Sequence, residues 1–228
     1  MAGLGIGPDD FALFEIEDPV ERADRLERQL QPKLQALGDE IVEGLSRVVG
    51  KDLFLHDTKI VRRKKVPPGE VFVAFCENPR MFKGLPYLAV AVTHAHLHAR
   101  VAVRGDSDRR IGMQQALERE ARNLARKGKP FRRIRDFTQW DFEELPEVAP
   151  AHSAAFWQEL AEGLIPSLPS RPPALEVGVS WPSEEARSLS VGDVLGVFRD
   201  LAPLYKLLAN SQSADDSGPG GGSQPAGP

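Results

Sequence analysis

The chain has 228 residues, of which 41% are hydrophobic and 27% charged, as in an ordinary globular protein large enough to form one sizeable core. No apolar run reaches the length of a bilayer span and no basic-then-apolar signal pattern opens the sequence, so we expect a cytoplasmic protein without a membrane segment. The single cysteine, Cys76, excludes an internal disulfide and fits a reducing compartment.

The net charge of -4 conceals a segregation of charge along the chain. Residues 51–135 carry +12, whereas the segments before and after them carry -6 and -10. One interpretation is a cationic surface patch that can attract an anionic partner. The other is internal neutralisation, in which the acidic segments fold against the basic one. The sequence leaves both open.

A helix begins at Asp18-Pro19, because Asp18 can cap it and proline suits the first helical position. An apolar stripe at helical spacing follows and ends at Gly50, a natural helix stop. Pro32 lies inside the stripe and predicts a kink or a break near residue 30. The stripe consists of Leu26, Leu30, Leu34, Leu37, Ile41, Leu45 and Val48.

Short apolar segments at 53–56, 71–75, 87–92 and 95–103 predict strands, the last two forming a hairpin that reverses near Thr93-His94. In the last arm, apolar side chains alternate with His94, His96, His98 and Arg100. Because successive side chains on a strand point to opposite faces, we expect one sheet face to pack on helices and the other to carry polar groups.

The remaining pattern predicts helices over 112–127, 152–164 and 190–208, and strands over 131–137 and 174–180. Residues 1–210 therefore read as a single α+β domain, with a mostly antiparallel central sheet and the N- and C-terminal helices packed on one face. Residues 211–228 are rich in Gly, Ser and Pro and predict a disordered tail.

A basic run before the double proline Pro67-Pro68 suggests an anion-binding site at a sheet edge. A small anionic ligand or nucleic acid is the partner that this site would suit. A solvated strand edge, where lysines deter pairing with other chains, is the alternative. The expected binding residues are Lys59, Arg62, Arg63, Arg80 and Lys83, with His56 and His96 lining the pocket.

The alternating histidines raise a second hypothesis, a metal-assisted hydrolase. Imidazoles two residues apart share a strand face and can chelate one transition metal, so His94, His96 and His98 are the candidate ligands. A third hypothesis is a structural protein that self-associates through its segregated charge. No residue pattern identifies a catalytic group or a cofactor, and whether the chain is an enzyme stays open.

Several segments together resemble the YktB-like proteins, a bacterial family with no established function. They are Gln31-Pro32-Lys33-Leu34, the order His56, Lys59, Arg62, Arg63, Pro67-Pro68, Val73-Ala74-Phe75, then Arg80 to Pro86, His96, Asp136 and Thr138, Glu176 and Gly178, and Pro203-Leu204-Tyr205. The resemblance runs from about Phe11 to Leu208 and implies a bacterial α+β single domain, without a substrate or cofactor. Histidines are common in that family where this chain has Ile60, Tyr87 and Phe137.

Overall fold

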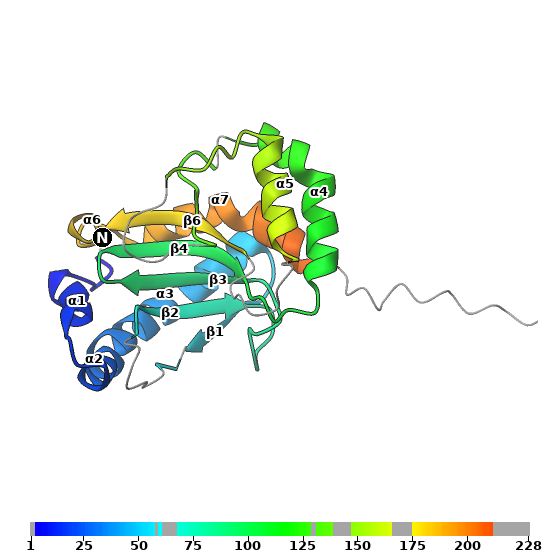
Figure 1. The fold of residues 1–228 in the computed structure, drawn as a ribbon. Helices are drawn as coiled ribbons and strands as arrows, with labels where there is room; N and C mark the ends of the chain where they lie inside the picture. The colour runs from blue at the N-terminus through cyan, green and yellow to red at the C-terminus, as the bar shows by residue number, and fades with distance from the viewer. Residues whose placement is uncertain are drawn as a thin grey trace, which may run out of the picture.

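A six-stranded antiparallel sheet forms the centre of the molecule, with strands in the order β1-β2-β3-β4-β6-β5 (Figure 1). The strands are β1 (Phe54–Asp57), β2 (Glu70–Cys76), β3 (Tyr87–Thr93), β4 (His96–Val103), β5 (Arg135–Asp136) and β6 (Leu175–Pro182). The computed structural model describes residues 3–57, 59–60, 68–128, 131–138, 147–165 and 175–211.

The N-terminal segment is helical from Pro19 to Val49. It comprises α2 (Pro19–Arg25), a π-helical turn η2 (Leu26–Leu30) and α3 (Gln31–Val49), after the short α1 (Pro8–Ala12) and the 3-10 turn η1 (Leu13–Glu15). The predicted disturbance before Pro32 is this π turn, in which the Gln31 backbone N–H donates to the Leu26 carbonyl. Gly50 ends α3 with φ of 75°, a left-handed conformation that glycine adopts at little cost.

The two faces of the sheet differ in what they bury. One face consists of branched side chains such as Val73, Val90, Val101 and Val177, which join the main hydrophobic core. Because side chains alternate along a strand, the opposite face carries small, aromatic and charged residues. We call this opposite face the polar face; it bears Glu70, Phe72, Tyr87, Thr93, His98, Arg100 and Glu176.

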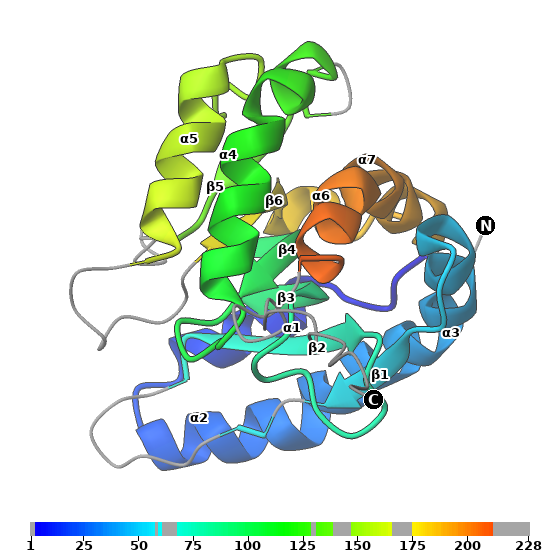
Figure 2. The ribbon, with the colours of Figure 1, turned by 90° about the vertical axis from the view of Figure 1, so that its right-hand side faces the viewer.

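The helices α3 and α7 (Val191–Ala209) cover the apolar face, as the sequence predicts for the N- and C-terminal helices (Figures 1 and 2). At α7 the start is fixed by a capping box, in which Ser190 and Asp193 bond each other's backbone N–H groups. The helix continues through Pro203 to Ala209. The short α6 (Ser183–Ala186) links β6 to it.

A helical hairpin stands beside the sheet. It consists of α4 (Arg110–Arg126) and α5 (Ala154–Gly163), which lie side by side and rise clear of the strands in Figures 1 and 2. The strand expected over 131–137 shrinks to the two residues of β5, because Phe131 and Ile134 use their N–H groups in successive turns. In the described residues no helix is long and apolar enough to cross a membrane.

Candidate functional site

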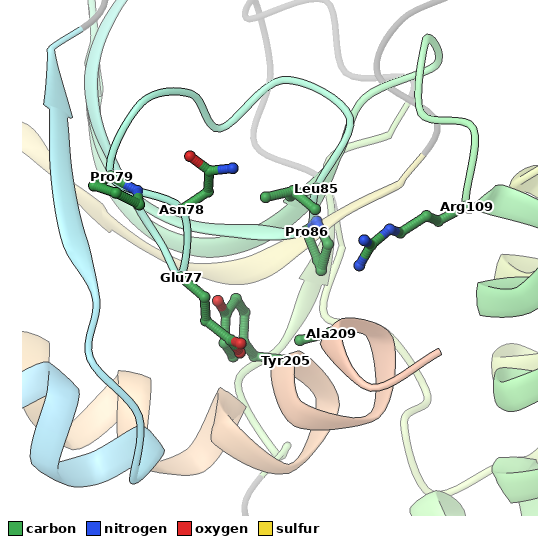
Figure 3. Close-up of a pocket in the computed structure, with 8 residues that line it drawn as sticks. All are labelled: Glu77, Asn78, Pro79, Leu85, Pro86, Arg109, Tyr205 and Ala209. Carbon is green, nitrogen blue, oxygen red and sulfur yellow. The ribbon is translucent and has the colours of Figure 1, made fainter. Parts of the chain in front are cut away.

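A pocket of about 280 Å³ lies where the loop after β2 meets the C-terminal end of α7 (Figure 3). We call it the loop pocket. Its apolar wall comes from the loop and from α7, whereas Glu77 and Arg109 supply its charged groups from different segments. The lining residues are Glu77, Asn78, Pro79, Leu85, Pro86, Arg109, Tyr205 and Ala209.

The two charged residues of the loop pocket differ in their pairing. Lys51 Nζ lies 2.9 Å from Glu77 Oε2 and also donates to the Asn210 side chain at 2.9 Å. The other carboxylate oxygen, Glu77 Oε1, is buried and accepts no hydrogen bond from the described residues. Among those residues, Arg109 has no carboxylate within ion-pair distance.

Local hydrogen bonds fix the loop that forms one wall. Asn78 Oδ1 accepts from the backbone N–H of Arg80 at 2.8 Å, and the ring nitrogen Nε2 of His56 bonds the Asn78 carbonyl at 2.8 Å. On the far side of the loop, the Ser107 hydroxyl donates to the Gly84 carbonyl at 2.6 Å. The loop is therefore tied both to the edge strand β1 and to the turn that carries Arg109.

The structure brings part of the expected basic site together. Arg80 and Lys83 lie exposed on this loop, and His56 on β1 contacts its Phe82, with ring centroids 5.7 Å apart. Lys59 is exposed just beyond β1. These three cations make no ion pair within the described part of the chain. Arg62 and Arg63, which we also expected to bind the anion, lie outside the described residues.

His96 lies apart from His56, although we expected both to line one pocket. His56 is on β1 in the same row as Arg100 of β4, three strands away, and His96 is four residues further along β4. With strands about 4.8 Å apart and a rise of about 3.4 Å per residue, the two backbone positions are roughly 20 Å apart. His56 supports the loop instead, and His96 belongs to the polar face.

Cys76 is a buried thiol beside His56, and a thiol next to a histidine is an arrangement found in catalytic nucleophiles. Its Sγ lies 3.4 Å from His56 Nε2, but that nitrogen is already bonded to the Asn78 carbonyl. A nitrogen that donates its proton there cannot also take the thiol proton. Burial raises the pKa of Cys76, which keeps it a neutral core thiol.

The polar face contains a buried ion cluster that the sequence did not single out. Arg100, 1% exposed, makes paired hydrogen bonds to Glu70 at 2.5 and 2.8 Å, and its Nη2 lies 3.4 Å from Glu176. The guanidinium also sits over the Phe72 ring at 5.6 Å. Its Nε meets no acceptor among the described residues. Two carboxylates thus share one arginine, which the alternating strand pattern could not reveal.

The electrostatics of this cluster follow from its burial. Loss of solvation raises the pKa of Glu176 to about 7, against the opposing pull of the Arg100 charge. Burial likewise raises the pKa of Tyr87, which lies beside the same charges. Tyr87 and Phe137, two of the positions where the resembled family commonly has histidine, are both buried here, and Phe137 packs on His98 with ring centroids 5.1 Å apart.

The three candidate metal ligands do not share one strand. His94 is exposed in the β3–β4 turn, His96 is half-buried, and His98 is fully buried beside Thr93. Burial lowers the pKa of His98 well below its usual value, so the ring is neutral. In the portions of the chain that the structure describes, no group of three or more His, Cys, Asp or Glu side chains is arranged to hold a metal ion.

Comparison with known proteins agrees with the resemblance. The chain is 36% identical over 97 residues to a UPF0637 protein of Bacillus licheniformis, a match covering 42% of this chain and 46% of that protein. A UPF0637 protein of Bacillus cereus is 36% identical over 91 residues, 39% of this chain and 44% of its own length. The matched segment thus spans less than half of each relative. The family model called "Domain of unknown function (DUF1054)" matches residues 7–205, and the chain belongs to that family.

Proposed function

We propose that the loop pocket binds a small organic anion that also carries a hydrogen-bond donor. The observation that carries this proposal is the pairing state of its two charged residues. Among the described residues, Arg109 has no carboxylate partner and can attract an anion, and Glu77 Oε1 is a buried acceptor without a donor. Figure 3 shows the two side chains on different sides of the pocket.

Arg109 would hold the anionic group. A guanidinium presents a rigid fork of N–H donors that matches the two oxygens of a carboxylate or phosphate, and such charge-assisted bonds are about twice as strong as neutral ones. Arg80 and Lys83, exposed on the same loop, would raise the local concentration of anions without contacting the ligand.

Glu77 would select the other end of the ligand. A buried acceptor without a donor costs about 1–3 kcal/mol, and a turn of the Glu77 side chain that presents Oε1 to a ligand amine or hydroxyl would recover that free energy. The wall between the charged groups is apolar, formed by Leu85, Pro86 and Ala209 with the ring of Tyr205. A volume of about 280 Å³ suits a ligand of metabolite size.

Thermal unfolding with two matched probes tests the proposal. Ethyl phosphate offers only the anion, whereas phosphoethanolamine adds an ammonium group. At ten times its dissociation constant a ligand stabilises by about 1.4 kcal/mol, which raises Tm by about 3–5 °C in a protein of this size. We expect both probes to raise Tm, and phosphoethanolamine to bind more tightly.

Three variants separate the contributions. Arg109→Gln should abolish the response to both probes, and Glu77→Gln should remove only the advantage of phosphoethanolamine. The control is Arg28→Gln, at an exposed arginine of the π turn η2, which should alter neither response. If neither probe shifts Tm at millimolar concentration in low salt, or if Arg109→Gln responds like the native chain, the pocket is not an anion site.

A further inference from the structure

A second basic region lies away from the loop pocket. The segment 119–135 contains eight basic residues and one acidic residue, a net charge of +7. Three of the arginines, Arg119, Arg122 and Arg126, are on α4 and exposed, and we call them the arginine row. This positive charge is concentrated in a short segment of a protein whose net charge is -4.

The arginine row runs along one side of α4. The helix buries Met113, Leu117 and Leu124 against the rest of the protein. At 100° per residue the three arginines fall on the opposite side, spaced three and four residues apart. With a rise of 1.5 Å per residue they cover about 10 Å of the helix axis. All three arginines are exposed, and the α4–α5 hairpin that carries them stands beside the sheet (Figures 1 and 2).

The arginines of the row lack the acidic partners that three arginines on other helices have, although Arg126 donates a hydrogen bond to the Asn123 side chain. Arg25, Arg28 and Arg47 each pair with an acidic residue four positions earlier. The two carboxylates on α4 accept hydrogen bonds from neutral amides, Glu118 from Gln114 and Glu120 from Asn123. Across the described residues, no ion pair joins the arginine row to a carboxylate.

A hollow continues the row beyond the end of α4. It has a volume of about 580 Å³, and Arg126 of the row, Arg132 and His152 are among its lining residues. Arg133 does not belong to this surface, because its charge acts on Asp193 and Asp200 of α7. Arg126 belongs to both the row and the hollow, and we call the two together the cationic track.

We propose that this track binds the sugar–phosphate backbone of a nucleic acid. A strand of duplex carries one phosphate charge per 3.4 Å of axis, so the arginine row of about 10 Å meets about three successive phosphates. A membrane surface fits less well, because a membrane-binding surface also needs exposed apolar side chains. Among the described residues, Val148 is the one exposed large apolar side chain that lines the hollow, and Ile111 lies at the opposite end of α4. Phosphate contacts of this kind hold a duplex without reading its sequence.

Fluorescence anisotropy with a labelled 20-base-pair DNA duplex tests this proposal across a series of salt concentrations. The native chain should bind more weakly as salt rises, with a linear dependence of log affinity on log salt. The triple variant Arg119→Gln/Arg122→Gln/Arg126→Gln should lower the slope by about 2–3 and the low-salt affinity by at least tenfold.

The matched control is Arg25→Gln/Arg28→Gln/Arg47→Gln, which removes the same charge from exposed positions on other helices. It should bind within about twofold of the native chain. The proposal is overturned if the duplex does not bind at low salt, if both triple variants lose affinity equally, or if vesicles rich in phosphatidylserine bind the arginine row more tightly than the duplex. Ethyl phosphate should stabilise both triple variants as it does the native chain, so this result is separate from that of the loop pocket.

Discussion

Arg100 occupies the middle of the sheet because its neighbours make room for it and neutralise it. Opposite it on β6 stands Gly178, where an added Cβ would lie 2.6 Å from the Arg100 Cβ and 2.2 Å from the Ala99 carbonyl oxygen. Removing one member of a buried ion pair typically costs 3–5 kcal/mol. The cluster with Glu70 and Glu176 therefore constrains which residues this part of the sheet can hold.

Glu176 should make stability depend on pH in a defined direction. Its pKa is about 7 in the folded chain and ordinarily 4.5, so between these values the folded state binds more protons than the unfolded state. Its stabilising protonation is complete below pH 4.5 and is lost as the pH rises through 7. From pH 4.5 to 7, we expect the free energy of unfolding of Glu176→Gln to rise by about 2–3 kcal/mol relative to that of the native chain, measured by urea unfolding.

The comparison must be made between variant and native chain, because His98 acts in the opposite direction. Its lowered pKa means that its contribution is lost as the pH falls. The charged groups that act on Glu176 are Arg100, Glu70, Asp136 and Arg104. A difference between Glu176→Gln and the native chain that is the same at pH 5 and pH 8 would show that Glu176 titrates normally.

At the scale of elements, two glycines of the helices should respond oppositely to alanine. Gly50 ends α3 with positive φ, so Gly50→Ala should cost about 1 kcal/mol through backbone strain alone, since its Cβ would meet no atom within 4 Å. Gly196 lies inside α7 with equally open space, and Gly196→Ala should gain about 0.5–1 kcal/mol. Urea unfolding of both variants checks this; a shift of the same sign in both would contradict it.

Most elements were predictable because their signals are local. The stripe that ends at Gly50, the apolar run Val71–Phe75 and the cap at Ser190 each depend on residues close in sequence, and the structure confirms all three. The prediction of a strand over 131–137 was mostly wrong. Its apolar residues are buried by successive turns, whose hydrogen bonds use the backbone N–H groups that a strand would need for pairing. Periodicity reports which side chains are buried, and not how the backbone achieves it.

The loop pocket could not be predicted for a different reason. Its lining comes from the loop after β2, the turn before α4 and the end of α7, and only the folded chain brings Glu77, Arg109 and Tyr205 together. The expected anion site included Arg80 and Lys83, which lie on the loop after β2, but also His96, which lies on β4. In the same way, the burial of Arg100 depends on two carboxylates from other strands.

At the scale of the whole molecule, both interpretations of the segregated charge hold, for different residues. Glu176, from the acidic last third, lies beside Arg100 of the basic middle, and Arg133 faces the carboxylates of α7. Arg109 and the arginine row, by contrast, have no such partner among the described residues. Among the described residues, folding thus pairs the buried Arg100 with carboxylates and leaves Arg109 and the arginine row without them.

The C-terminal tail should contribute nothing to this assembly. Ser211 is buried at the end of α7, where its hydroxyl donates to the Leu208 carbonyl, so a deletion should begin after it. The composition of residues 212–228, which lie outside the described chain, predicts that they are disordered. Deleting them should leave Tm almost unchanged in calorimetry, with deletion from Lys206 as a destabilised control. A loss of several degrees would show that the tail docks.

The strand order also sets a sequence of events in time. β1 to β4 follow one another along both the chain and the sheet, so this part of the sheet can assemble from neighbours as soon as Val103 has been synthesised. β5 cannot join, because its partner β6 comes about 40 residues later and must first pair with β4. Pairings between distant segments form slowly. During synthesis, the β4 edge that later receives β6 therefore stays open until the last third of the chain is made.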